Sequence, residues 1–298
     1  MTMSLRSAAR LTLLLAAVAL PALAAPPDAE VEALQMPAWL TRDGQRTPLA
    51  PGVRLRSGDR IDTGTGARAL LRLHDGSMVK LGEKAHFRLD GIPAGRCCAD
   101  GVFKATLNVL EGAFRFTTTA LYKFRGRREV EVRFPTVTAG IRGTDLWGKA
   151  TAEREIVALI EGRITVTRRG TPPLDLDQPR SLYQALRNAG VLPVEQISDE
   201  ALAVYAAETE MAPGQGAAGK GGKWRVYAAR VRTQDEALAA YDRLREAGYP
   251  ATIHPTQKDG ATVYQVRIGG LLSEADGVAV AIRLKSELGL TEVSVSLI

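Results

Sequence analysis

The chain has 298 residues, which is enough for about two domains of ordinary size. Its formal net charge is +6, and the positive charge is concentrated in residues 37–170, which hold 24 Lys and Arg against 14 Asp and Glu. The three histidines lie in different segments and the two cysteines are adjacent, so no zinc-binding pattern can be assembled. Neither a phosphate-binding P-loop nor a dinucleotide fingerprint is present, and we expect no metal and no cofactor.

The first 24 residues have the pattern of a secretory signal peptide. Arg6 and Arg10 form a short positive region, an apolar run follows over 11–20, and Ala22 and Ala24 give the small-x-small pattern that signal peptidase recognises. We expect cleavage after Ala24 and an exported mature protein. The run is shorter than the about 20 apolar residues needed to cross a bilayer, so no transmembrane segment is expected after cleavage.

Export argues against nucleic acid as the partner of the basic region. Anionic envelope material, such as peptidoglycan carboxylates or lipid head groups, could be attracted by its charge. The alternative is that these charges only form a solvated rim.

Residues 37–170 alternate apolar and polar positions in short runs separated by Gly and Asp, a pattern typical of strands and tight turns. Acid-glycine steps at 73–76, 109–112 and 159–162 are each predicted to form a turn between two strands. This loose repetition predicts an all-β domain, built as a β-solenoid or a rolled sheet. The candidate strands are 69–73, 77–81, 105–110, 114–118, 129–134, 155–160 and 163–167.

Two glycines interrupt a strand-like stretch, FPTVTAGIRGTDLWG, at residues 134–148. A glycine inside a strand marks a bulge, a bend or a close approach of another backbone. We therefore expect Gly140 and Gly143 to let the segment turn a corner, with Ile141 and Leu146 packed inside. The alternative is that Arg142 and Thr144 dock a partner.

Four segments of this region resemble the FecR domain family: GDRIDTGTGARALLRLHDGSMVKLGEKAHFRL (58–89), VLEGAFRF (109–116), FPTVTAGIRGTDLWG (134–148) and VALIEGRITVT (157–167). The resemblance covers most of residues 37–170 and is most specific at Arg142-Gly143-Thr144. It implies a periplasmic β-rich module of the kind that forms the outer half of anti-sigma regulators. Those regulators carry a membrane span before this part, whereas this chain has only a cleavable leader. We therefore do not expect this polypeptide alone to signal across a membrane.

Residues 171–211 read as a helical connector. Helices are predicted at 180–188 and at 199–211, the second with Ser198 as its N-cap. The following segment, 212–222, contains GQGAAGKGG, and its glycine content predicts a flexible linker.

The C-terminal part, residues 223–298, changes its hydrophobic period several times. Strands are predicted at 224–231, 251–255, 262–268 and 292–297, with helices at 233–248 and 273–288. The order is βαββαβ, which predicts an α+β domain of the ferredoxin-like type. The two halves correspond at an offset of 40 residues, so the domain is also an internal duplication.

This duplicated half-motif resembles the SPOR domain, most closely over YQVRIGGLLSEADG at 264–277. The resemblance implies binding to peptidoglycan, particularly to glycan strands stripped of their stem peptides, and so a link to cell division sites. In the first half, Tyr227, Ala229 and Val231 stand where the family commonly has Gln, Gly and an aromatic residue.

Alternation along the strands predicts which side chains face away from the helices. Candidate peptidoglycan-binding residues on that face are Arg225, Tyr227, His254, Gln265 and Arg267. A tyrosine can stack on sugar C–H surfaces, while amide and guanidinium groups can bind hydroxyl and acetamido groups or the lactyl carboxylate of muramic acid. The alternative is that an open sheet simply needs a polar outer face.

Enzymatic chemistry is not expected. His74-Asp75-Gly76-Ser77 has the residue types of a catalytic triad, but four consecutive residues of a hairpin turn diverge, whereas triad residues converge from separate segments. Cys97 and Cys98 could form a vicinal disulfide or a contact with another chain, or lie unpaired in an exposed loop.

The sequence thus predicts a non-enzymatic periplasmic protein that binds peptidoglycan glycan strands through its C-terminal domain, with a β-rich domain that docks a second envelope component. The alternative is a regulatory module that acts through a membrane-bound signalling partner. A wall hydrolase is a third hypothesis.

Overall fold

The computed structural model describes residues 28–91, 102–118, 127–141 and 143–298. The predicted signal peptide, Arg142, Cys97 and Cys98 lie outside these residues. Within the described residues, no helix has the length and apolar character needed to cross a membrane.

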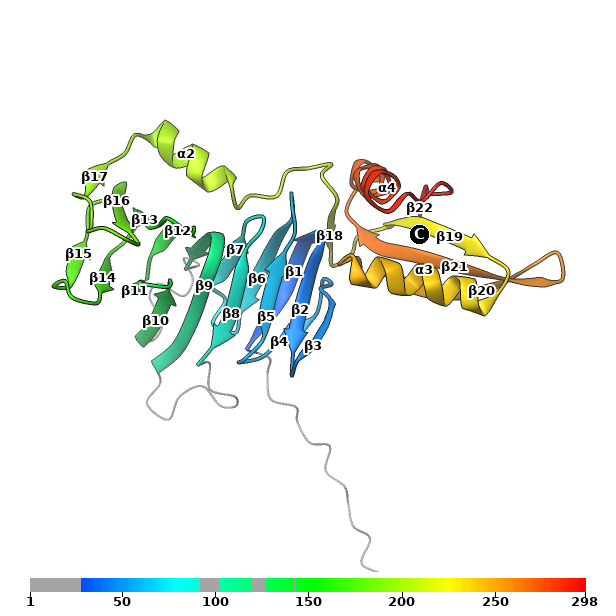
Figure 1. Ribbon diagram of the computed structural model, residues 1–298, viewed down its shortest axis with the longest axis horizontal. Coiled ribbons are helices and arrows are strands. Elements are labelled where there is room, and N and C mark those ends of the chain that lie inside the picture. The colour runs from blue at the N-terminus through cyan, green and yellow to red at the C-terminus, as the bar shows by residue number, and fades with distance from the viewer. Residues whose placement is uncertain (1–27, 92–101, 119–126, 142) are drawn as a thin grey trace, which may run out of the picture.

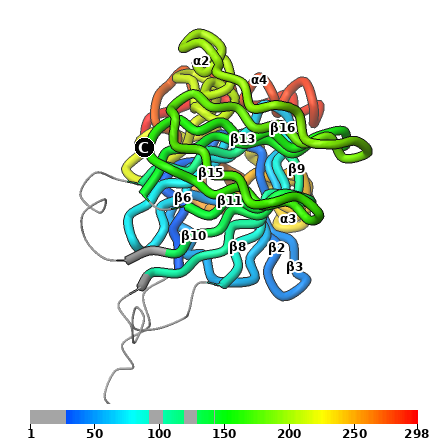
Figure 2. The backbone as a smooth tube through the Cα atoms, turned by 90° about the vertical axis from the view of Figure 1, so that its left-hand side faces the viewer, coloured from blue at the N-terminus to red at the C-terminus, as the bar shows by residue number. Residues whose placement is uncertain are grey.

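The N-terminal domain consists of two stacked sheets (Figures 1 and 2). Sheet A runs β1–β6–β7–β9–β12–β13–β16–β17, with β4 also paired to β1, and sheet B runs β3–β2–β5–β8–β9–β10–β11–β14–β15. The strands are β1 (Ala29–Gln35), β2 (Ala38–Arg42), β3 (Gln45–Pro48), β4 (Arg54–Leu55), β5 (Arg60–Thr63), β6 (Arg68–Leu73), β7 (Met78–Leu81), β8 (His86–Asp90), β9 (Val102–Thr117), β10 (Arg127–Arg133), β11 (Val137–Ile141), β12 (Asp145–Ala150), β13 (Arg154–Glu161), β14 (Ile164–Arg168), β15 (Leu174–Leu176), β16 (Ser181–Leu186) and β17 (Glu195–Gln196).

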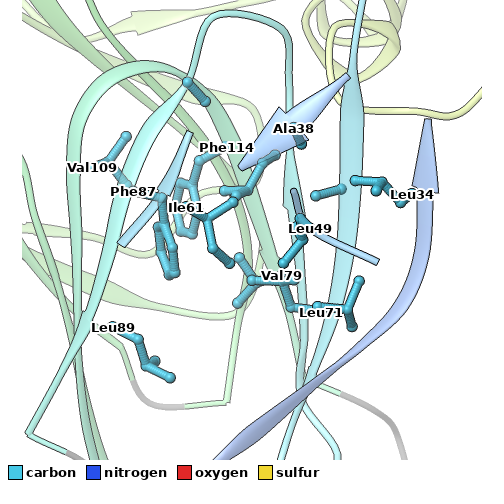
Figure 3. Packing of buried hydrophobic residues seen from close by; sticks show 14 of the residues in the cluster. Leu34, Ala38, Leu49, Ile61, Leu71, Val79, Phe87, Leu89, Val109 and Phe114 are labelled. Carbon is cyan, nitrogen blue, oxygen red and sulfur yellow. The ribbon is translucent and has the colours of Figure 1, made fainter. Parts of the chain in front are cut away.

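The core of this domain lies between the two sheets. Leu71, Val79 and Phe114 of sheet A pack toward Ile61 and Phe87 of sheet B, and all five are essentially inaccessible to solvent (Figure 3). Every strand pair among the described residues of this domain is antiparallel except β9 with β10. Stacked turns of a β-helical solenoid would pair in parallel. The antiparallel pairing seen here therefore does not match the β-solenoid alternative.

One long strand, β9, belongs to both sheets. Its residues up to Glu111 pair with β8 in sheet B, and those from Gly112 to Thr117 pair with β12 in sheet A. Gly112 lies at the bend, with φ of +87°, and a Cβ there would be 2.5 Å from the Cα of Ala85. The turn predicted at 109–112 is therefore wrong: the glycine bends a continuous strand instead of ending it.

The glycine-containing stretch at 134–148 turns a corner at Gly143, as expected, but not at Gly140, which lies inside strand β11 and pairs with Glu131 and Thr165. It leaves sheet B at the end of β11 and enters sheet A with β12, and Gly143 has φ of +71° between them. Ile141 and Leu146 are buried on either side. Thr144 is also fully buried, and its Oγ1 donates a hydrogen bond of 2.9 Å to the carbonyl of Arg163. This burial leaves Thr144 unavailable to a docking partner.

The connector contains one of the two predicted helices. Residues 181–186 form strand β16, paired with β13, instead of a helix. The second helix, α2 (Asp199–Ala207), begins after Ser198, whose side chain accepts a hydrogen bond from the amide of Ala201, as predicted for an N-cap. It lies outside the two layers (Figure 2), where Tyr205 stacks on Trp147 of sheet A at a centroid distance of 4.7 Å.

The C-terminal domain has the six elements in the predicted order: β19 (Trp224–Val231), α3 (Gln234–Glu246), β20 (Thr252–Lys258), β21 (Ala261–Leu271), α4 (Glu274–Leu288) and β22 (Ser294–Leu297). Its antiparallel sheet runs β20–β21–β19–β22. Thr233 and Ser273 cap the two helices, and the Thr233 cap is a complete capping box with Glu236.

Residues 212–222, predicted to be a flexible linker, are instead a structured segment that connects the two domains, which we call the joint. Ala217–Gly219 form β18, which pairs with β1 on one side and with Leu271 of β21 on the other, and Ala217 and Ala218 are buried. The glycines here serve close packing, since a Cβ on Gly222 would lie 2.1 Å from the carbonyl oxygen of Gly270. The C-terminal domain is thereby held beside the end of the N-terminal domain that carries β1, β2 and β3 (Figure 1).

Side chains of α4 fix this joint. The buried carboxylate of Asp276 accepts hydrogen bonds of 3.0 Å from the amides of both Gly216 and Ala217. Arg283 donates to the carbonyl of Gln215 at 2.6 Å and also to the carbonyl of Met36 in the N-terminal domain. The two domains are also connected away from α4: Nε1 of Trp39 in β2 donates to the carbonyl of Glu246 at the end of α3, at 3.0 Å.

Asp276→Ala is expected to destabilise the joint, because it leaves two buried N–H groups without an acceptor. Each such group costs about 1–3 kcal/mol, so a loss of about 2–6 kcal/mol in the free energy of unfolding is expected, with faster proteolysis within 212–222. Urea denaturation and limited proteolysis measure the two effects. Asp276→Asn keeps an acceptor oxygen and is expected to lose less, and Glu274→Ala, an exposed residue of the same helical turn, serves as a control. An Ala variant that resists protease like the parent protein would contradict the assignment.

A buried tyrosine makes stability depend on pH. Tyr249 is 1 % exposed, its hydroxyl has no hydrogen-bond partner among the described residues, and burial raises its pKa to about 12. An unfolded tyrosine titrates near pH 10, so above that pH the unfolded chain releases the proton first. The free energy of unfolding therefore falls between about pH 10 and 12, by up to about 2–3 kcal/mol.

Tyr249→Phe is expected to remove this part of the alkaline loss and to leave stability at pH 7 unchanged or higher, since no hydrogen bond is lost. Denaturation measured at pH 7, 9 and 11 tests this expectation. Tyr241→Phe, at a half-buried position on α3, is the control. Parallel pH profiles for the Tyr249→Phe variant and the parent chain would exclude Tyr249 as the cause.

Candidate functional site

One face of the C-terminal sheet is covered by helices and the other is not. Ala237 and Leu244 of α3 and Val280 and Leu284 of α4 share a buried cluster with Val226, Ala228, Val266 and Ile268 of the sheet, the last four as predicted from alternation. The side chains between them point to the opposite side, which we call the outer face. None of the predicted site residues on this face is buried.

The structure brings the predicted residues together on the outer face. Tyr227 of β19 lies directly opposite Arg267 of β21, and His254 of β20 lies opposite Gln265 of β21. Arg225 lies opposite Ser296 of β22. All five candidate side chains are half-buried.

A β-bulge adds an arginine that alternation did not predict. The register of β19 against β21 shifts between Tyr227 and Ala229, so Arg230 lies opposite Gln265. Its guanidinium lies 4.0 Å from the centroid of the Tyr227 ring, and its Nη1 donates to the Ser294 hydroxyl at 3.0 Å. Strict alternation would have pointed this arginine at the helices, and that implausible placement was the signal of a bulge in the sequence.

The outer face is electropositive. Burial raises the pKa of Tyr227, but a side-chain hydrogen bond with Ser296 and the charges of Arg225, Arg230 and Arg267 outweigh it, so the pKa lies below its ordinary value. The pKa of His254 is lowered, first by burial and then by the charges of Arg267 and Arg225. His254 is therefore neutral at pH 7 and can both donate and accept hydrogen bonds.

A cavity of about 360 Å³ lies where the outer face meets the N-terminal domain. We call it the junction cavity. Arg225, His254 and Arg267 line it from the sheet, Lys220 lines it from the end of the joint, and Ala50 and Pro51 line it from the N-terminal domain. Tyr227 and Gln265 lie on the same face but outside the cavity lining.

A larger hollow, of about 1,290 Å³, lies between α4, the connector and the N-terminal domain, and none of the predicted site residues lines it. The exposed side chains of Val278 and Ile282 form part of its wall.

The triad-like residues form a turn. Ser77 is fully buried, and both its amide and its hydroxyl donate to the carboxylate of Asp75, at 3.0 and 2.8 Å. The arrangement is a local turn contact in the β6–β7 hairpin, as predicted. Within the described ranges, His, Cys, Asp and Glu side chains nowhere gather in a group of three that could hold a metal.

Comparisons with known families agree with this organisation. Residues 59–165 match the model of the FecR protein family, and residues 220–295 match the model of the SPOR domain. The chain therefore carries a FecR domain followed by a SPOR domain, as the two resemblances predicted. Both are binding or regulatory domains, not enzymatic families.

Among solved structures, two crystal structures of "a putative anti-sigma factor from Parabacteroides distasonis ATCC 8503", at 1.65 and 2.50 Å resolution, are similar to this chain. Each is 16 % identical, with 76 % of this chain and 92 % or 91 % of the other chain covered, at a TM-score of 0.40. In a comparison with curated proteins, none matches this chain.

Proposed function

We propose that this protein is a non-enzymatic periplasmic component of the cell envelope that binds peptidoglycan glycan strands through the outer face of its SPOR domain. The observation that carries the proposal is the uncovered outer face, on which one tyrosine, three arginines, a neutral histidine and a glutamine lie together. The strand order β20–β21–β19–β22 with both helices on the other side supports a ferredoxin-like reading of the domain.

The chemistry of this face suits a sugar chain. An aromatic ring can pack on the apolar C–H surface of a pyranose, and guanidinium and amide groups can bind its hydroxyl and acetamido oxygens. Since the guanidinium groups of Arg230 and Arg225 lie 4.0 and 6.0 Å from the centroid of the Tyr227 ring, a sugar would pack on the part of the ring that they leave free. Binding is expected to be favoured by the positive charge of the face when the sugars carry carboxylates.

Sedimentation with isolated sacculi tests the proposal. The mature chain, residues 25–298, is mixed with sacculi before and after an amidase has removed the stem peptides, and the pellet is assayed for protein. We expect sedimentation in both cases and more of it after amidase treatment. A protein that stays in the supernatant in both cases would remove the proposal, and release of soluble muropeptides would replace it with a wall hydrolase.

The second candidate function is an envelope signalling module, in which the FecR domain engages a membrane-bound partner and the wall contact is secondary. The match of residues 59–165 to the FecR family favours it. The two functions predict different effects of substitutions on the outer face. Outer-face variants would abolish wall binding in the first case, whereas in the second they would leave partner capture by the N-terminal domain intact.

A further inference from the structure

The junction cavity is lined by three positively charged side chains. Arg225, Arg267 and Lys220 line it, and none of the described Asp or Glu side chains does. The charge of Lys220 is neutralised by Glu30 of the N-terminal domain, which does not line the cavity: Lys220 Nζ lies 2.5 Å from Glu30 Oε1. Among the described residues, neither Arg225 nor Arg267 forms an ion pair, so these two guanidinium groups hold the uncompensated charge.

Arg225 also has a hydrogen-bond donor that is not satisfied. Arg225 Nε is buried and has no acceptor among the described residues. A buried donor of this kind is costly unless a ligand or water supplies an acceptor. Arg225 lies beside a second irregularity in the pairing of β19 with β21, where Gly270 has φ of +78°, and such bulges re-aim side chains next to binding sites.

The cavity is also walled by a domain other than the SPOR domain. Ala50 and Pro51 belong to the loop between β3 and β4, and this loop is fastened by the hydrogen bond from the Gly52 amide to the Val31 carbonyl at 2.8 Å. The position of this wall relative to Arg225 is set by β18, which pairs with strands of both domains. A volume of about 360 Å³ falls within the range of small-ligand sites, about 300–1,000 Å³.

We propose that the junction cavity is a subsite for a sugar unit that carries a free carboxylate, and that both domains build it. Arg225 and Arg267 bind the carboxylate, the orphaned Nε of Arg225 gains its acceptor there, and Ala50 and Pro51 pack against the apolar surface of the ring. This inference rests on the proposed function and adds two points to it: the N-terminal domain takes part in glycan binding, and the site selects charged over neutral sugar units.

The test compares two forms of one ligand on the full mature chain. Soluble glycan fragments with free carboxylates are prepared, and half of them are amidated with methylamine, which removes the charge and keeps the sugars. Titration calorimetry gives the Kd for each form. The parent protein is expected to bind the free acid at least about 10-fold more tightly, since hydrogen bonds to a charged group are stronger than those to a neutral one.

Two variants assign this preference to the cavity. Arg225→Gln is expected to lose the preference for the free acid while keeping weaker binding of both forms. Ala50→Trp fills the cavity from the N-terminal domain and is expected to weaken binding of the acid at least about 10-fold. Ala189→Trp, at an exposed position of the same domain near β16, is the matched control and is expected to bind like the parent chain.

The outcomes separate this inference from the proposed function. Equal Kd values for the acid and the amide, or normal binding by the Ala50→Trp protein, would overturn the composite subsite and leave glycan binding by the outer face standing. No binding of either form by the parent protein would overturn both. Thermal melting of each variant shows whether it is folded, and Arg225→Gln provides the test if Ala50→Trp is not.

Discussion

Replacing Tyr227 and Arg267 together by alanine is expected to weaken binding to denuded glycan strands by about 100-fold or more. Truncating a central tyrosine or arginine at a binding face commonly costs about 2 kcal/mol or more, and each 1.4 kcal/mol is a factor of ten in affinity. The two residues lie opposite one another on neighbouring strands, so a ligand that contacts one is within reach of the other. Because they are in contact range, their separate effects need not add.

The Kd from titration with amidase-treated glycan measures this loss, and two controls show what causes it. Tyr227→Phe keeps the ring and is expected to retain most of the affinity if stacking dominates. Arg245→Ala removes an arginine that lies 5.1 Å from the ring centroid of Tyr241 on α3, away from the outer face, and should bind normally. A double variant that binds within about 3-fold of the parent protein would show that the outer face is only a solvated surface.

Gly112→Ala is expected to lower the free energy of unfolding by about 2–5 kcal/mol. A left-handed backbone costs a residue with a Cβ about 1–2 kcal/mol, and overpacking adds about 1–3 kcal/mol. Here the new Cβ would lie 2.5 Å from the Cα of Ala85, and backbone cannot rotate away as a flexible side chain could. The variant would force the bend of β9 to open and would separate the two sheets that this strand joins.

Chemical denaturation of the full chain measures this effect, and Gly58→Ala is the matched control. Gly58 has φ of +93°, close to that of Gly112, but no atom of the described residues lies within 4 Å of the position of its Cβ. The control therefore carries the cost of the backbone conformation without the clash. If the two variants lose the same stability, the close approach to Ala85 has no energetic role.

Much of the C-terminal domain could be predicted from its sequence because local signals and tertiary packing agree there. Thr233 and Ser273 are strong N-cap residues that precede amphipathic helices, and both cap the helices in the structure. The alternation of Val226 and Ala228 with Arg225 and Tyr227 correctly separated the core side from the outer face. The joint assembly of five site candidates on one face followed from this single periodicity.

The sequence did not reveal features that depend on distant partners. Residues 181–186 contain apolar positions compatible with either period, and pairing with β13 decides in favour of a strand. The glycine content of 212–222 predicts a flexible linker, but hydrogen bonds to Asp276 and pairing with β1 hold this segment in place. Arg230 joined the site only through a bulge, and Ala50 and Pro51 came to the junction cavity from about 170 residues earlier in the chain.

The small strand β18 has a mechanical consequence. This strand is hydrogen-bonded to β1 and to β21, so rotation of the SPOR domain relative to the N-terminal domain would break these backbone pairs. A glycan strand gripped by this domain would therefore also fix the orientation of the FecR domain. Anything that recognises the FecR domain would then meet it at one constant height and angle above the wall.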